Sequence, residues 1–299
     1  MTRLTTSAGA RQANYDLQRA MRTMTDIQRQ LTSGRRLERV SDAPADAVSS
    51  LTQRSELRRV EQYARNAERA TSWVRSGDAA LASVDDQLSA VRSLLIQANS
   101  GAADATARAG IATQIRAIRA ALLDTANTQV EGRPIFAGTV AGLKAYDSSG
   151  SYVGDAGAVN VPVSSNVTMQ VNVSGTTVFG TANLLDPTQG DVFQVLDSIA
   201  TAVQNGDTTA MGAGLGLIDT AAQRVAQAQV VLGARGAQLE SLELANVDAS
   251  TNLKAGISRL EDVDLAEALI GLRTREAAYQ AALQATAKVV QPSLLDFLR

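Results

Sequence analysis

The sequence predicts a mainly α fold: a long coiled-coil rod from paired N- and C-terminal helices with a small inserted β domain. Both ends carry apolar residues at alternating spacings of three and four, which is typical of coiled coils. Aromatic residues make up 3% of the chain and apolar residues 45%, so small side chains suited to close helix packing dominate. The middle of the chain is instead rich in Gly and Ser and poor in charge.

Composition excludes several functions. The 28 basic and 30 acidic residues are interspersed and give a net charge of -2, so we expect neither nucleic acid nor membrane as a partner. The chain has no Cys and no His, which removes thiol nucleophiles, common zinc ligands and the Ser/His/Asp triad. We therefore expect no enzyme activity, no cofactor and no metal. No apolar run after Thr2 and Arg3 is long enough for a signal-peptide core, so if the protein leaves the cell, we expect export without a cleaved signal peptide.

The first helix is expected to end at Ser33 and Gly34, because glycine commonly caps a helix C-terminus. Ser41 and Asp42 are candidate caps for the next helix, and Pro44 suits its first turn. The apolar seam of the first helix consists of Ala10, Leu17, Met21, Met24 and Leu31, with Asn14 and Gln28 as polar members.

A second, much longer helix is predicted from Pro44 to Ala98, followed by a stop at residues 99–101. Asp104 can cap a return helix that leads to a stop at residues 132–134. The seam of the long helix keeps its phase through Val60, Tyr63, Ala67, Ala70, Val74, Gly77, Leu81, Val84, Leu88, Val91, Leu95 and Ala98.

Residues 137–190 are expected to form the β insert, exposed on the outside of the helical assembly. Apolar residues alternate from Val167 to Val173, and Ser174 and Gly175 separate them from residues 176–179, which predicts a two-residue hairpin.

The helical pattern resumes at Asp191, with expected interruptions at residues 205–207 and at the Gly-rich residues 211–216. After Val263 the seam changes phase, which indicates a join between two packing environments. The seam before the join contains Val225, Ala228, Leu232, Leu239, Leu242, Ala249, Leu253, Leu260 and Val263, with Arg235, Asn246 and Gly256 as weak members. The seam after it contains Leu265, Leu269, Leu272, Tyr279, Leu283 and Val290.

Two terminal motifs carry a family resemblance. The N-terminal motif is LTSGRRL at residues 31–37 followed by SDAP at 41–44, and it includes Ser33, Gly34, Arg35, Ser41, Asp42 and Pro44. The C-terminal motif is LEDVDLAEA at 260–268 with QPSLLDFL at 291–298. The chain resembles the bacterial flagellin superfamily, and GRPIFAG at 132–138 resembles its hook-associated protein 3 branch. Ala43 departs from the second Asp of the family's Ser-Asp-Asp-Pro.

The resemblance implies a layered architecture. Residues 1–34 with 264–299 would form an inner terminal coiled-coil layer, 35–136 with 191–263 a helical rod domain, and 137–190 the outer β-rich insert. The terminal seams would form the assembly interface, through Leu17, Met21, Met24, Leu31, Leu265, Leu269, Leu272, Tyr279, Leu283 and Val290. Because these seams contain polar members, we predict that residues 1–32 and 265–299 are disordered in the monomer.

The function implied by the resemblance is structural: a subunit that polymerises between the flagellar hook and filament and is needed for swimming. Implied partners are copies of itself, a hook-associated protein 1-type subunit, flagellin and an export chaperone, and the location is extracellular, after flagellar type III export. The alternatives are a flagellin filament subunit and, more distantly, a secreted coiled-coil adhesin. Acidic groups such as Asp85 with Asp86, or Glu261 with Asp262 and Asp264, are expected to be solvated.

Overall fold

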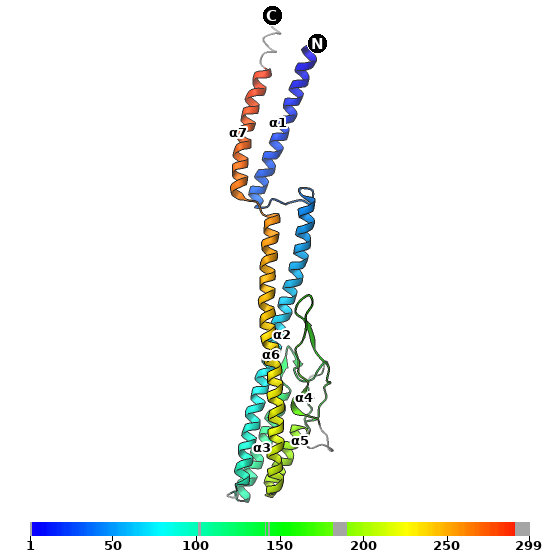
Figure 1. The fold of residues 1–299 in the computed structure, drawn as a ribbon, viewed down its shortest axis with the longest axis vertical. Helices are drawn as coiled ribbons and strands as arrows, with labels where there is room; N and C mark the ends of the chain where they lie inside the picture. Colours follow the sequence, from blue (N-terminus) through cyan, green and yellow to red (C-terminus); the bar gives the residue numbers. More distant parts are fainter. Residues whose placement is uncertain (1, 101–102, 141, 143, 182–189, 291–299) are drawn as a thin grey trace. The chain divides into compact units, whose positions relative to one another are not determined.

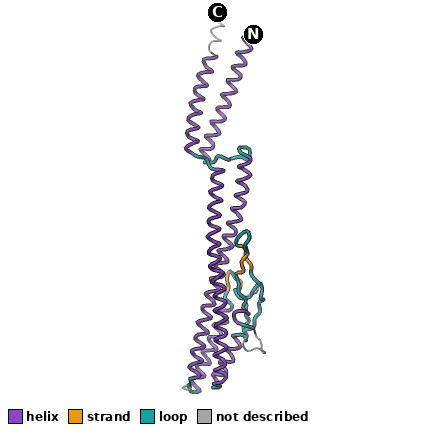
Figure 2. The backbone as a smooth tube through the Cα atoms, viewed as in Figure 1, coloured by secondary structure: helices purple, strands orange, loops and turns teal. Residues whose placement is uncertain are grey.

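The computed structural model describes residues 2–100, 103–140, 142, 144–181 and 190–290, with side chains from residue 11 to residue 286 (Figure 1). It is mainly helical, with short strands between the helices, as predicted. The strands, orange in Figure 2, lie between α3 and α5 in the order of the chain. The elements are α1 Thr2–Ser33, α2 Pro44–Asn99, α3 Ala105–Ala126, β1 Gln129–Val130, β2 Arg133–Pro134, β3 Asn160–Pro162, β4 Thr168–Gln170, α4 Gly175–Phe179, α5 Val192–Asn205, α6 Thr208–Glu261 and α7 Leu265–Val290.

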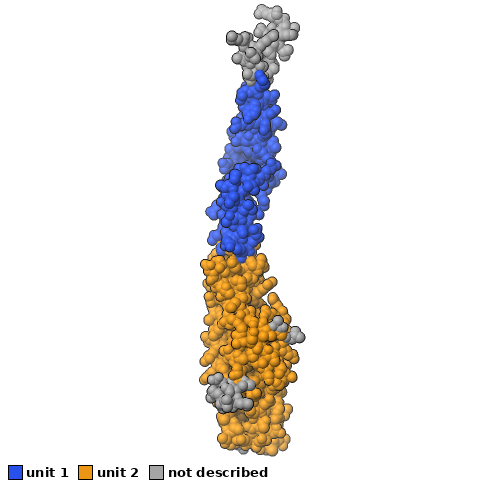
Figure 3. Space-filling view, turned by 90° about the vertical axis from the view of Figure 1, so that its right-hand side faces the viewer, with its two compact units in different colours: residues 1–59, 249–299 blue, residues 60–248 orange. Residues whose placement is uncertain are grey.

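The chain forms two compact units, coloured separately in Figure 3. Unit 1 contains residues 1–59 and 249–299, and unit 2 contains residues 60–248. The predicted three-layer division is a different partition of the chain and stays a prediction.

Unit 2 holds the apolar core. The predicted seam of the long helix is confirmed, since Leu81, Leu88 and Leu95 are at most 1% exposed and most other members are buried. The α6 seam faces it: a Cβ atom on Gly77 would lie 3.0 Å from Leu232 Cδ1. Each fully buried Leu side chain contributes roughly 2 kcal/mol of burial free energy, so the seam stabilises this unit along much of its length.

The return helix α3 begins as predicted, because Asp104 Oδ1 accepts a hydrogen bond from the Ala107 amide at 2.7 Å. It ends earlier than predicted, at Ala126. Gly132 is instead in the tight turn of the β1–β2 hairpin, where Glu131 and Gly132 both have positive φ. The Asn127 side chain ends the helix by bonding Leu123 and the backbone of Tyr146.

The predicted hairpin around Ser174 and Gly175 is wrong. The alternating stretch contributes β4, which pairs antiparallel with β3, and residues 175–179 form the short helix α4. The physical reason is tertiary packing: Val178 and Phe179 are about 1% exposed and turn into an aromatic cluster. The cluster contains Phe136, Tyr146, Tyr152, Phe179 and Phe193, with neighbouring ring centroids 5.0–5.7 Å apart. The segment expected to be a polar insert therefore has a buried core.

The predicted interruption at residues 211–216 is also wrong, because α6 runs through it from Thr208. Only the break at residues 205–207 is real: Gly206 has a left-handed φ of 73°, and Asp207 Oδ1 accepts from the Ala210 amide. Glycine is needed at 214 for packing, since a Cβ atom there would lie 2.8 Å from Ile199 Cγ1 of α5.

Candidate assembly site in unit 1

The terminal helices α1 and α7 pack against each other in unit 1. The half-buried apolar positions of α1 keep the predicted alternation of four and three. They share Leu17, Met24 and Leu31 with the predicted seam, while Ala13, Ala20 and Ile27 stand where Asn14, Met21 and Gln28 were expected. At every second contact, the residue of α1 that faces α7 is therefore the one immediately before the predicted residue. The half-buried apolar positions are Ala13, Leu17, Ala20, Met24, Ile27 and Leu31, and the polar residues Thr23 and Gln30 are half-buried beside them.

This pairing leaves many apolar side chains in water. Met21 is 54% exposed, Leu265 54%, Leu269 50% and Leu283 43%. Leu272 and Tyr279 are half-buried, and the Val290 side chain lies outside the described residues, as does the motif at 291–298. A two-helix contact of this kind does not bury either helix's full apolar surface. Four of the predicted interface residues, Met21, Leu265, Leu269 and Leu283, therefore remain exposed in the single chain.

The loop after α1, the first turns of α2 and the end of α6 are held together by hydrogen bonds to Glu261. Its carboxylate receives hydrogen bonds from the Arg54 guanidinium, with Nε at 2.6 Å, and from the Ser50 hydroxyl. Its carbonyl oxygen accepts from the backbone amides of Arg36, at 2.7 Å, and Leu37, at 3.3 Å. We call Arg36, Leu37, Ser50, Arg54 and Glu261 the helix-break cluster.

The N-terminal motif at residues 31–44 forms the loop between α1 and α2 that contacts this cluster. Gly34, with a φ of 70°, follows the last residue of α1, and its carbonyl accepts from the Val263 amide at 3.1 Å. Arg35 pairs with Asp262 in an antiparallel bridge. Pro44 is the first residue of α2 as predicted. The side chain of Asp42 accepts from the Arg39 amide, so Asp42 closes the loop instead of capping α2.

The expectation that the Glu261 carboxylate is solvated is wrong, because its side chain is buried. The hydrogen bonds from Arg54 lower the pKa of Glu261 to about 2, so it is ionised at neutral pH. A carboxylate at the junction between two apolar seams, next to Leu260 and Val263, is the signal that could have found it. Asp262 and Asp264 are exposed, as expected, and Asp264 Oδ1 caps α7 through the Ala266 amide.

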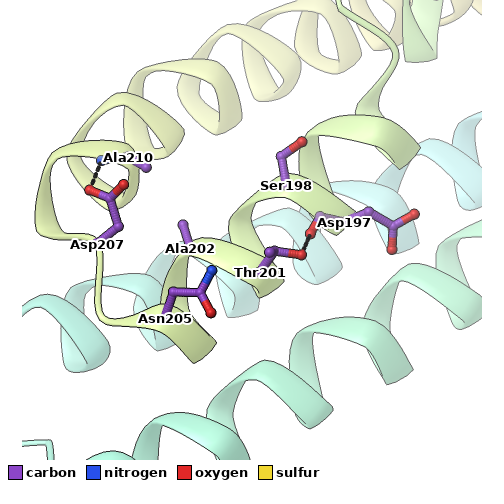
Figure 4. Close-up of a pocket in the computed structure, with 7 residues that line it drawn as sticks. All are labelled: Asp197, Ser198, Thr201, Ala202, Asn205, Asp207 and Ala210. Carbon is purple, nitrogen blue, oxygen red and sulfur yellow. Dashed lines mark hydrogen bonds between the residues drawn. The ribbon is translucent and has the colours of Figure 1, made fainter.

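No catalytic arrangement accompanies these residues in the described part of the chain. An open groove of about 480 Å³ lies between α5 and the start of α6 in unit 2 (Figure 4). Several of its polar groups have partners within unit 2: Thr201 donates to the Asp197 carbonyl, the Asp197 carboxylate pairs with Arg119 at 2.8 Å, and Asp207 caps α6. Among the described residues, no group of three acids, His or Cys is placed to hold a metal ion.

One buried acid lies elsewhere in unit 2. Asp191 is 4% exposed and caps α5 through the Phe193 amide at 2.9 Å. Burial raises the pKa of Asp191 to about 6, although the hydrogen bond and the nearby Arg119 and Arg224 oppose the rise. Its contacts are those of a helix cap.

None of the described helices combines the length and apolarity needed to cross a bilayer.

Two family models match the chain: the bacterial flagellin N-terminal helical region over residues 5–141, and the C-terminal helical region over residues 215–298. Together they cover both paired ends and most of the chain between them. The chain therefore belongs to the bacterial flagellin family, a family of structural flagellar proteins, and this places it in the bacterial flagellum. Within that family it is similar to flagellar hook-associated protein 3, which confirms the resemblance carried by the terminal motifs.

Two curated relatives illustrate the match. Flagellar hook-associated protein 3 of Salmonella typhimurium is 25% identical over 90% of this chain and 91% of its own length. Flagellin of Bacillus subtilis is 27% identical over 90% of each chain. Percentage identity alone does not separate the two branches of the family.

Solved structures show the same fold. A flagellar hook-associated protein from Vibrio parahaemolyticus superimposes with a TM-score of 0.67 at 22% identity, covering 74% of this chain and all of that one. The flagellar junction protein FlgL from Legionella pneumophila gives a TM-score of 0.58 at 17% identity, covering 71% of this chain and 99% of its own.

Proposed function

We propose that this chain is the junction subunit between the flagellar hook and filament, and that it polymerises through its terminal helices. The observation that carries the proposal is the unfinished packing of unit 1. Among its described side chains the only buried apolar residues are Ala47 and Ala268, while Met21, Leu265 and Leu269 are about half exposed. Neighbouring subunits that cover these side chains would supply the missing core.

Several features favour a junction subunit over the alternative of a flagellin filament subunit. The matched relatives include hook-associated protein 3 and a structure titled flagellar junction protein. The sequence at 132–138 also resembles that branch, and it contains β2 and Phe136 of the aromatic cluster. A filament subunit would form long self-polymers, whereas a junction subunit would stop after a short assembly.

The partners follow from this role. Below the assembly we propose a hook-associated protein 1-type subunit, above it flagellin, and laterally further copies of this chain. An export chaperone would cover the C-terminal helix before passage through the flagellar type III system to the cell exterior. The proposed layers are the inner pair 1–34 and 264–299, the rod 35–136 and 191–263, and the outer insert 137–190.

Ordering of the termini only on contact with neighbouring subunits would control when the chain polymerises. If residues 1–32 and 265–299 are disordered in dilute monomer, the ordering free energy is recovered only when several subunits align, which suppresses premature polymers. Amide resonances measured by NMR test this directly. Narrow, poorly dispersed signals are expected for both segments, and dispersed signals would contradict the idea.

Gene deletion in the source bacterium tests the function. The expected result is non-swimming cells that carry hooks without filaments and release flagellin into the medium, with full rescue by the intact gene. Normal filaments after deletion would show a minor flagellin or an unrelated secreted protein. The adhesin alternative is tested separately, since an adhesin does not add to isolated hooks.

A further inference from the structure

A small apolar groove opens beside the helix-break cluster in unit 1. It has a volume of about 210 Å³, and its floor contains the buried residues Ala47, Ser50 and Glu261. Its rim includes Val40, which is 61% exposed, and Leu51, which is 59% exposed. We call this surface the Val40 groove. Two large apolar side chains exposed to this extent beside a buried floor leave apolar area that a partner can cover.

The rim of the Val40 groove is basic. Arg35 and Arg39 line it and are exposed. Among the described residues no carboxylate forms an ion pair with the Arg39 guanidinium, and the lining acid Glu38 lies 4.0 Å from Arg29 instead. The buried Glu261 carboxylate is already neutralised by Arg54. A partner for this groove therefore needs apolar side chains flanked by negative charge.

The first turns of α7 present that combination. Leu265, Leu269 and Ile270 are 54%, 50% and 68% exposed, and we call them the Leu269 face. Asp264 caps the helix and Glu267 lies exposed in its first turn. The Leu269 face thus carries apolar area with acids at its N-terminal end, and the exposed Arg273 lies one turn beyond Leu269. The acidic end is the chemical complement of the basic rim of the Val40 groove.

We propose that the Leu269 face of one copy packs into the Val40 groove of the next copy, with Glu267 near Arg39. Both surfaces are exposed in the same chain, so neither covers the other there. A contact between two different surfaces of identical subunits is heterologous and repeats until a ring closes. The proposal rests on the proposed function and adds which surfaces meet when the subunits polymerise.

Cysteine cross-linking tests the contact cleanly because the chain has no Cys. Leu51→Cys and Leu269→Cys would be purified separately, mixed, added to hooks isolated from cells lacking this gene, and oxidised. We expect a disulfide-linked species of twice the 31.3 kDa chain mass only in the mixture. The matched control replaces Leu269→Cys with Val153→Cys, a site of equal 50% exposure in unit 2, and should give no cross-link.

Charge reversal provides the second readout. Arg39→Glu and Glu267→Arg should each reduce the cross-link yield about tenfold, the equivalent of one ordinary charge contact. The double variant carries both changes in every copy and should restore it. Circular dichroism melting of each variant should match the parent chain, because all these side chains are exposed.

The outcomes separate this contact from the proposed function. Addition to hooks without a cross-link between positions 51 and 269 overturns the contact and leaves the junction function standing. Cross-linking within the Leu51→Cys sample alone, between two grooves, also overturns it. Failure of the parent chain to add to hooks overturns both.

Discussion

Unit 2 buries a continuous apolar core that runs from Ala67 to Leu239, whereas unit 1 buries only two alanines among its described apolar side chains. In place of a core, unit 1 has the helix-break cluster, in which a buried carboxylate connects segments far apart in the chain. This difference teaches that one unit forms its own core, while the other is left open in the single chain, as the proposed assembly requires. Each prediction below tests that division.

The largest expected effect is in the core of unit 2. Leu88→Ala should lower the free energy of unfolding by about 3 kcal/mol, because a fully buried leucine leaves a cavity. Urea unfolding followed by the fluorescence of Trp73, the single tryptophan and a residue of unit 2, measures it. The matched change Leu265→Ala should alter that value by less than about 0.5 kcal/mol. Equal effects would contradict the assignment of the stabilising core to unit 2, because Trp73 reports the unfolding of that unit.

The next effect concerns the helix-break cluster. Glu261→Gln keeps the side chain's shape but removes the charge that pairs with Arg54, and should destabilise unit 1 by about 2 kcal/mol. Amide hydrogen exchange should accelerate around residues 34–37 and 260–264, while the Trp73 transition stays unchanged. Glu267→Gln, at an exposed carboxylate nearby, serves as control. Unchanged exchange in the Glu261→Gln chain would refute a stabilising role.

The two buried acids should give the units opposite responses to pH. The pKa of Asp191 is raised to about 6 in the folded chain, so the folded state binds the proton more tightly and unit 2 gains stability as pH falls from 7 to 5, by about 1–2 kcal/mol. The pKa of Glu261 is lowered to about 2, so its contribution persists above pH 4.5 and is lost toward pH 2.

Urea midpoints at pH 7 and pH 5, followed by Trp73, measure the Asp191 effect. Asp191→Asn retains a good helix cap and should remove the difference between the two midpoints. A pH dependence that survives this substitution would assign the effect to another group.

The smallest effect on the isolated chain is expected at the exposed face of α7. Leu269→Ser should change monomer stability by less than about 0.5 kcal/mol, because the side chain is half exposed. Its effect on assembly should be large: addition to isolated hooks, measured by sedimentation, should fall well below that of the parent chain. A variant that assembles normally would remove Leu269 from the interface.

Periodicity predicted the helical parts of the fold in detail. The seam from Val60 to Ala98 needed no tertiary information, because a helix that packs on a neighbour must repeat its apolar residues every three or four positions. Capping chemistry similarly predicted Asp104 as a helix start and Gly34 as a helix end. Errors occurred where glycine was interpreted as a break: in α6, Gly214 permits close approach of Ile199 and the helix continues.

The sequence by itself determined the mainly α class, the pairing of the two ends, the change of phase after Val263 and the family, since periodicity, caps and terminal motifs are local properties of the chain. Only the tertiary structure decided that residues 175–179 turn into an aromatic cluster, that Met21 lies on the open side of α1, and that Glu261 is buried. The physical reason is that burial depends on which distant segments meet. Glu261 and Arg54 are 207 positions apart, and no local pattern records their contact.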